Sequence, residues 1–354
     1  MSARIHVRGQ ARYRWRVAAQ LGQSVLEVSL RRLLKGPRRP SWNYSVEVGT
    51  QLLKKHVTAA FEMSDVKEAR HFLDSVMISS PATQMVNVTP VEQVKLRGSW
   101  FTPRDAQSAV TVLYFHGGGY SFYPPAYSYF ISLISLATKS RTFALDYRLA
   151  PEHRFPAQLE DALKAYQWLL DNGTDCQNLV VAGDSAGGNL ALALLLATRD
   201  AKLPLPALAI ALSPPTAIPI ELISNLDLDW IDQRMLMQWA DWFCDPGQRC
   251  DPLVSPLHAD LHGLPPIYMQ AGRTEILYDS IQAFAEHGKN QGADIALESW
   301  PDMNHVFQMF GPDAPQSAEA LRRIGEVVDL RVRRLEKKQV LPLCTSVSSV
   351  VNGF

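Results

Sequence analysis

Residues 178–196, NLVVAGDSAGGNLALALLL, join three kinds of local sequence in one stretch. Leu179–Val181 is an apolar run rich in β-branched residues and typical of a buried strand, GDSAG (183–187) breaks it, and an Ala/Leu-rich helical run follows. A strand, a tight turn and a helix around G-x-S-x-G predict that Ser185 occupies a strained turn with its hydroxyl exposed at the strand end. The helix N-terminus would then direct free N–H groups toward a developing oxyanion. The pentapeptide alone also fits a glycine turn without function, so the other segments decide.

Composition is that of an ordinary globular protein. The chain has 354 residues, 47% apolar and 20% charged, with a formal net charge of zero, which gives no support for a nucleic-acid partner. Residues 1–40 carry ten Arg/Lys and one Glu, a charge of +9, which leaves −9 for the rest. Four cysteines without a C-x-x-C pair, no signal peptide and no long apolar run favour a cytoplasmic location, with a Cys244–Cys250 bridge left open.

From residue 109 onward, apolar runs alternate with helical segments, which predicts a parallel sheet with helices on both faces. Candidate buried strands are 110–115, 142–145, 179–181, 207–212, 267–270 and 295–297. Candidate helices are 127–140, 156–171, 188–198, 280–291 and 315–336.

Other segments flank this core. Alternating apolar residues in 86–96 predict antiparallel edge strands, and the aromatic span between 213 and 266 is too long for a loop and predicts a helical cap. Helices are expected at 11–36, 45–60 and 66–75. The first has a basic polar face, so it either lies on an anionic membrane surface or packs on the body as a lid.

A glycine triplet follows the strand predicted at 110–115. Gly117, Gly118 and Gly119 contribute no side chains, so their role lies in backbone shape. N–H groups of such a loop can hold a negatively charged oxygen. His116, which precedes them, is expected to organise the loop by hydrogen bonding rather than to transfer protons.

An activated serine needs a base, and that base needs an orienting acid. His305 lies in the loop after the last predicted strand, at the strand end where parallel sheets bind ligands. Glu275 and Asp279 follow the strand predicted at 267–270, and Glu275 lies closer to its end. The order Ser185, Glu275, His305 is nucleophile, acid, base. We therefore predict Glu275 as the acid, with Asp279 as the alternative.

Four motifs in order carry a family resemblance. They are HGGG (116–119), DYRLAPE (146–152) with FPA (155–157), GDSAG (183–187) and MNHVF (303–307). With them, the chain resembles the hormone-sensitive-lipase-like branch of the α/β-hydrolases from about Met85 to Val328. The resemblance implies an α/β-hydrolase fold, a mostly parallel central sheet with helices on both faces and a helical cap. It places the N-terminal cap segment at 1–80, the core at 85–213 and 263–338, the cap insertion at 214–262 and a flexible tail at 339–354.

The resemblance also implies a carboxylic ester hydrolase that acts through an acyl-serine, with no cofactor and no metal. The backbone N–H groups of Gly117, Gly118 and Ala186 would form the oxyanion hole. The family has Asp where this chain has Glu275, whose side chain is one methylene longer but can still orient an imidazole. We expect His305 to activate Ser185, so that activity falls on the acidic side near pH 6–7.

The substrate is less constrained. Tyr120, Trp230 and Trp239 are candidate pocket residues, which favours short-to-medium acyl esters, although aromatic residues of a cap can also serve packing alone. Three alternatives stay open: an arylformamidase-type amide hydrolase, a membrane-associated lipase anchored by 11–36, and a non-catalytic receptor for small molecules. Both a monomer and a homodimer fit the sequence.

Overall fold

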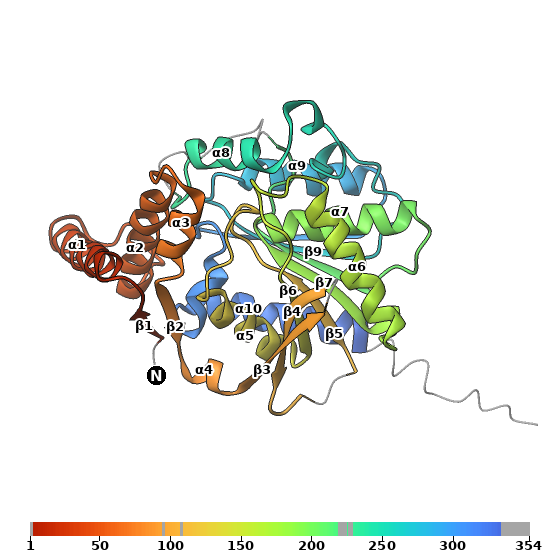
Figure 1. Ribbon diagram of the computed structural model, residues 1–354, viewed down its shortest axis with the longest axis horizontal. Coiled ribbons are helices and arrows are strands. Elements are labelled where there is room, and N and C mark those ends of the chain that lie inside the picture. Colours follow the sequence, from red (N-terminus) through yellow and green to blue (C-terminus); the bar gives the residue numbers. More distant parts are fainter. Residues whose placement is uncertain (1–2, 94–95, 107–108, 219–224, 226–228, 334–354) are drawn as a thin grey trace, which may run out of the picture.

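The computed structural model describes residues 3–93, 96–106, 109–218, 225 and 229–333 (Figure 1). The tail expected at 339–354 lies outside these residues. A mixed eight-stranded sheet organises the chain. Its strands in spatial order are β10 (Ile295–Trp300), β9 (Ile267–Gly272), β8 (Leu208–Leu212), β7 (Leu179–Asp184), β5 (Thr111–Phe115), β6 (Arg141–Leu145), β4 (Leu96–Pro103) and β3 (Val86–Gln93).

The strands from β10 to β6 run parallel, whereas β4 pairs antiparallel with both β6 and β3. This confirms the six predicted strands and the antiparallel edge, but the strand at 295–297, expected to be buried, lies at the edge of the sheet as β10, where only Ile295 is buried. Every residue of β5, β7, β8 and β9 is buried. Burial on both faces explains why these strands are continuous apolar runs rather than alternating patterns.

Helices cover both faces of the sheet. One face packs against α5 (Tyr127–Thr138) and α10 (Pro315–Val328), and the other against α6 (Ala157–Asp171), α7 (Ala186–Asp200) and α9 (Tyr278–Asn290). Successive strand residues point to opposite faces, so alternate residues of β5 contribute to the two separate cores. The parallel strands therefore deliver their carboxyl ends, with the loops that follow them, to one edge of the sheet.

The N-terminal segment lies beside this core as three helices: α1 (Ala11–Lys35), α2 (Tyr44–Phe61) and α3 (Val66–Leu73). Figure 1 shows α1 outermost, with α2 and α3 nearer the body. The buried Glu47 carboxylate binds Arg31 and Arg32 at 2.9 and 3.1 Å, which ties α1 to α2. In the later insertion, Asp232 caps α8 (Gln233–Phe243) by accepting a hydrogen bond from Met235 N.

Some features differ from the sequence-based expectation. A two-stranded sheet of β1 (Arg4–Val7) and β2 (Val76–Ser79) was not predicted, because four-residue strands so far apart leave no local signal. The helix predicted at 315–336 is the α-helix α10 as far as Val328 and continues as the π-helical turn η5 (Asp329–Arg333), while residues 334–336 lie outside the described part of the chain. Cys244 and Cys250 are both free thiols, so the bridge between them is not formed.

Candidate active site

Ser185 occupies the sharp turn between β7 and α7. Its backbone has φ 50° and ψ −124°, a strained conformation for a residue with a side chain. The flanking glycines make the turn sterically possible. A Cβ at Gly187 would lie 2.0 Å from Phe115 O, and one at Gly183 would lie 2.2 Å from Gly187 O. The strand and the helix approach so closely that only glycine fits on either side of the serine.

The structure brings three of the predicted residues together. His305 Nε2 lies 2.9 Å from Ser185 Oγ, and His305 Nδ1 lies 3.5 Å from Glu275 Oε2. The side chains of His305 and Glu275 are 1% and 0% exposed. The alternative acid, Asp279, lies in the first turn of α9, and no contact within the described ranges joins it to His305. The geometry therefore selects Glu275 as the partner of the imidazole.

Burial shifts the pKa values of His305 and Glu275. It lowers the pKa of His305, although the nearby carboxylates of Asp229 and Asp184 oppose the shift. It also raises the pKa of Glu275, a shift that the positive charge of His305 opposes once the imidazole has taken the serine proton. A lowered pKa keeps the imidazole neutral and able to accept the Ser185 proton at pH values where an ordinary histidine is partly protonated. Because the pKa of His305 is lowered, we expect the midpoint of the acidic fall in activity to lie below 6.5, the ordinary pKa of histidine, and so toward the acidic end of the range expected from the sequence.

Asp229, a residue that the sequence did not single out, holds both catalytic loops. Its Oδ1 accepts hydrogen bonds from the N–H groups of His305 (3.1 Å) and Trp230 (2.8 Å), and its Oδ2 accepts one from Ile276 N (3.0 Å). Trp230 Nε1 donates to His305 O at 2.8 Å. Asp229 and Trp230 thus bind the backbone N–H and C=O groups of His305, respectively. Asp229 also binds the backbone of Ile276, the residue after Glu275.

Direct contacts also join the loop of the acid to the loop of the base. Thr274 donates from both N (3.0 Å) and Oγ1 (2.8 Å) to Met303 O. A Cβ at Gly272 would lie 2.1 Å from that same oxygen, so glycine is needed where the two loops meet. Asn304 Nδ2 donates to Thr50 Oγ1 of α2 at 3.0 Å. The loop that carries His305 is therefore held by β9, by α2 and by the insertion.

His116 has the environment of an organising residue. Its ring is stacked between those of Tyr123 and Tyr147, at centroid distances of 3.7 and 4.1 Å. Burial lowers its pKa to about 3, so the imidazole is neutral. Nδ1 lies 2.7 Å from Gly117 O, which identifies this nitrogen as the N–H donor to the glycine loop. These contacts agree with the expected role of organising the loop by hydrogen bonding.

The glycine loop corrects one prediction. The N–H group of Gly117 donates to Asp184 Oδ1 at 3.1 Å, so Gly117 is not free to bind an oxyanion. The same carboxylate accepts hydrogen bonds from the hydroxyls of Tyr114 (2.7 Å) and Tyr127 (3.1 Å). Asp184 is fully buried, and burial raises its pKa to about 6. Asp184 therefore shapes the glycine loop through these three hydrogen bonds.

Other N–H groups beside the serine remain available. Across the part of the chain that the structure describes, the N–H groups of Gly118, Gly119 and Ala186 donate no hydrogen bond. Gly118 and Gly119 have φ values of 97° and 60°, a region that favours glycine. A Cβ at Gly119 would also lie 2.0 Å from Trp239 Nε1, so the missing side chain lets the indole lie against the loop.

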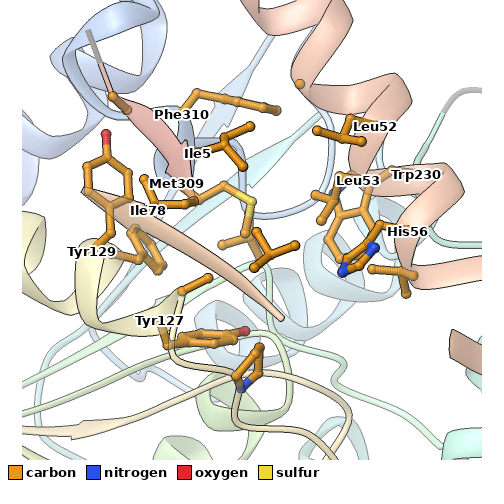
Figure 2. Close-up of a pocket in the computed structure, with 18 of the residues that line it drawn as sticks. Ile5, Leu52, Leu53, His56, Ile78, Tyr127, Tyr129, Trp230, Met309 and Phe310 are labelled. Carbon is orange, nitrogen blue, oxygen red and sulfur yellow. The ribbon is translucent and has the colours of Figure 1, made fainter. Parts of the chain in front are cut away.

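A large apolar cavity of about 480 Å³ opens onto Ser185 and His305. Figure 2 shows its wall, in which Leu52, Leu53 and His56 of α2 lie beside Trp230, and Tyr127 and Tyr129 approach from α5. The predicted pocket residue Trp230 thus lines this cavity. Its volume falls in the usual range for small-molecule sites, and its lining suits an apolar group.

A second, smaller cavity of about 40 Å³ also reaches Ser185. Ala186, Leu236 and Ala240 line it together with the predicted pocket residue Tyr120, whose hydroxyl donates to Asn189 Oδ1 at 2.5 Å. His305 lines the large cavity and not this one. The third predicted pocket residue, Trp239, lines both cavities, so its indole stands between them.

Comparisons with known proteins agree with this geometry. Residues 112–309 match the model of a family described as having the alpha/beta hydrolase fold. The chain is 37% identical to an acetyl-hydrolase of Streptomyces hygroscopicus over 64% of this chain and 77% of that protein. It is 30% identical to an esterase of Acinetobacter venetianus over 78% of this chain and 93% of that protein.

Solved structures of esterases are also similar to this chain. The structure of EstE5 soaked with p-nitrophenyl butyrate aligns with a TM-score of 0.76 and 32% identity, covering 82% of this chain and 100% of that one. An esterase from the bacterial hormone-sensitive lipase family aligns with a TM-score of 0.69 and 30% identity, covering 89% and 98%. The chain belongs to the α/β-hydrolase fold family, in its hormone-sensitive-lipase-like branch, and is a serine carboxylesterase.

Proposed function

We propose that this esterase hydrolyses esters that join a short acyl group, acetyl above all, to a bulky apolar alcohol. The observation that carries the proposal is the unequal size of the two cavities at Ser185, about 480 and 40 Å³. One half of the ester must be small, and the other half can be large and apolar.

The position of His305 assigns the two halves. The catalytic imidazole first takes the proton of the serine hydroxyl and then gives it to the leaving alcohol oxygen. The alcohol must therefore leave on the side of the nucleophile that the imidazole faces. His305 lines the large cavity, so the alcohol group would occupy it and the acyl group would occupy the small one.

In this mechanism, Ser185 Oγ attacks the ester carbonyl as His305 Nε2 removes its proton, and an acyl-serine forms as the alcohol leaves. We propose that the N–H groups of Gly118, Gly119 and Ala186 bind the tetrahedral oxyanion, since all three are uncommitted. Glu275 stabilises the imidazolium. Water then attacks the acyl-serine by the same sequence of proton transfers.

The volume of the small cavity limits the acyl chain. A cavity that holds one water molecule has a volume of roughly 10–15 Å³, so about 40 Å³ accommodates a two-to-three-carbon group. The similarity to an acetyl-hydrolase supports this assignment. The volume of the small cavity thus narrows the acyl groups expected from the sequence, short to medium, to the short ones.

Two isomeric esters test the proposal. Decyl acetate and ethyl decanoate have the same atoms and similar apolar surface, but the long chain lies on opposite sides of the ester bond. We expect kcat/KM for decyl acetate to be at least about tenfold higher. A preference for ethyl decanoate would overturn the assignment of the cavities.

Leu236→Ala gives the matched variant. It removes bulk from the wall of the small cavity and leaves Ser185 and His305 unchanged. We expect the ratio of the two kcat/KM values to fall because longer acyl chains gain room, while activity on decyl acetate persists. An unchanged ratio would show that the small cavity does not hold the acyl group.

Four further expectations stay proposals for this chain. They are a cap formed by residues 1–80 and 214–262, a cytoplasmic location, a monomeric or homodimeric state, and contact of residues 11–36 with a membrane surface. Along the described residues, none of the helices combines the length and the apolar character that crossing a bilayer requires.

A further inference from the structure

The outer face of α1 exposes large apolar side chains in its C-terminal half, from Leu26 to Leu34, and at Trp15 nearer its start. The five most exposed are Trp15 (76%), Leu26 (59%), Leu30 (50%), Leu33 (82%) and Leu34 (77%), which we call the α1 stripe. At 100° per residue, Leu26 and Leu33 fall within about 20° of the direction of Trp15. Surface leucines scattered singly need no explanation, but four exposed leucines within nine residues of one helix, with Trp15 in line with two of them, mark an interaction site.

The opposite face of α1 belongs to the body of the protein. Tyr13, Val17, Ser24 and Val28 are buried, and they lie about 160–220° around the helix from Trp15. Val17 and its neighbour Leu21 also line the large cavity at the active site. Helix α1 thus has two apolar faces, one toward the cavity and one toward the outside, where Figure 1 shows no other element.

The surroundings of the stripe are basic. Residues 1–40 have a net charge of +9. Arg12, Arg31 and Arg32 are paired with carboxylates of the protein itself. By contrast, Arg8 and Arg14 are exposed and form no ion pair with any described residue. An exposed apolar stripe flanked by unpaired cations is the pattern of a helix that lies in the interface of a bilayer.

We propose that the α1 stripe docks this esterase on the surface of an anionic lipid bilayer, with α1 parallel to the membrane plane. Trp15 would sit at the headgroup level, where tryptophan is enriched, and the leucines would enter the acyl-chain boundary. The arginines would approach the anionic headgroups. The inference rests on the surface of α1 and goes beyond the proposed ester preference.

A second copy of the chain is the weaker occupant. Stripe-to-stripe packing would bring two copies of the same basic segment, with its exposed Arg8 and Arg14, into contact, and like charges across an interface oppose association. An anionic bilayer complements the same charge. It is also the phase in which esters of bulky apolar alcohols accumulate, and α1 lies between that phase and the large cavity.

Vesicle co-sedimentation of the full chain tests the proposal. We expect the wild type to sediment with phosphatidylcholine vesicles containing about one third phosphatidylglycerol, and much less with phosphatidylcholine alone or at high salt. Leu26→Gln/Leu33→Gln should lower the partition coefficient at least about tenfold. Leu330→Gln, which changes a leucine that is 51% exposed on η5, is the matched control and should bind like the wild type.

Two readouts keep a negative result interpretable. Turnover of the water-soluble ester 4-nitrophenyl acetate should be unchanged in the double variant and in the control, because neither touches the active site. This activity is independent of whether the long-chain preference proposed above holds. Sedimentation velocity reports the oligomeric state without lipid.

Three outcomes would overturn the inference. The first is no binding of the folded wild type to anionic vesicles. The second is equal binding by Leu26→Gln/Leu33→Gln. The third is a wild-type dimer that the double variant converts to a monomer, which would assign the stripe to a second copy.

Discussion

Replacing Asp229 with asparagine tests the unpredicted link between the insertion and the catalytic loops. Asn is nearly isosteric but has one acceptor oxygen in place of two. It can still accept hydrogen bonds from His305 N and Trp230 N, but its NH₂ group then faces the N–H of Ile276. The substitution also removes a negative charge close to the imidazole of His305.

The expected magnitude follows from these two losses. A buried N–H left without an acceptor costs about 1–3 kcal/mol. We expect most of that cost to displace the loops that carry His305 and Glu275, and the imidazolium also loses a stabilising charge. Each 1.36 kcal/mol added to the activation free energy slows the reaction tenfold, so kcat/KM should fall about 10- to 100-fold.

The pH dependence separates the charge from the structural role. Burial raises the pKa of Asp229 to about 6. Above that pH the wild-type carboxylate is charged and opposes the lowering of the His305 pKa, whereas below it the carboxyl is neutral like asparagine. The ratio of wild-type to Asp229→Asn activity should therefore be largest above pH 6 and shrink below it.

The assay is kcat/KM on 4-nitrophenyl acetate from pH 5 to 8, together with thermal unfolding of each variant. Asp232→Asn is the matched control, because this residue caps α8 in the same insertion and asparagine caps a helix equally well. It should retain wild-type activity. An Asp229→Asn enzyme within twofold of the wild type would refute the reasoning, and a loss that is constant with pH would leave Asp229 a purely structural role.

Three further predictions concern single residues. For the wild type, the acidic midpoint of kcat/KM should lie below pH 6.5 because burial lowers the pKa of His305; a midpoint above 7 would contradict this. Glu275→Gln should reduce kcat at least about 100-fold while Asp279→Asn stays within about threefold, and the reverse order would move the catalytic acid to Asp279. Burial lowers the pKa of His56 to about 4, so as the pH falls His56 takes up a proton in the unfolded chain before it does so in the folded protein. Between pH 7.5 and 4.5 the free energy of unfolding, measured with urea, should therefore fall by about 2–3 kcal/mol more in the wild type than in His56→Leu. Equal losses in both proteins would contradict this.

The sequence predicted what local pattern controls. Ser185, Glu275 and His305 each follow a strand of the parallel part of the sheet, and because parallel strands end at one edge of the sheet, their order along the chain was enough to expect them together. The strands themselves were predictable because burial on both faces gives continuous apolar runs. The choice between Glu275 and Asp279 needed the structure. Both residues follow β9 and are only four positions apart, but Glu275 lies in the site, whereas Asp279 lies on the first turn of α9.

Tertiary partners account for what the sequence missed. Gly117 was assigned to the oxyanion hole, but its N–H is taken by Asp184, and nothing in the motif HGGG says which glycine points where. Asp229 lies near two other acids, Asp227 and Asp232, and no spacing rule distinguishes the one that binds the loop of His305. The unequal cavities arise where segments far apart in sequence meet, so their sizes were not predictable from composition.

The most direct test of the central claim is to trap the acyl-serine chemistry on the nucleophile. Wild type and Ser185→Ala are incubated with a 4-nitrophenyl alkylphosphonate, nitrophenol release is followed, and the labelled peptide is mapped by mass spectrometry. We expect one equivalent of adduct on Ser185, complete loss of 4-nitrophenyl acetate hydrolysis in the labelled wild type, and neither labelling nor activity in the folded Ser185→Ala protein. Stoichiometric labelling at another residue, or substantial hydrolysis by Ser185→Ala, would contradict it.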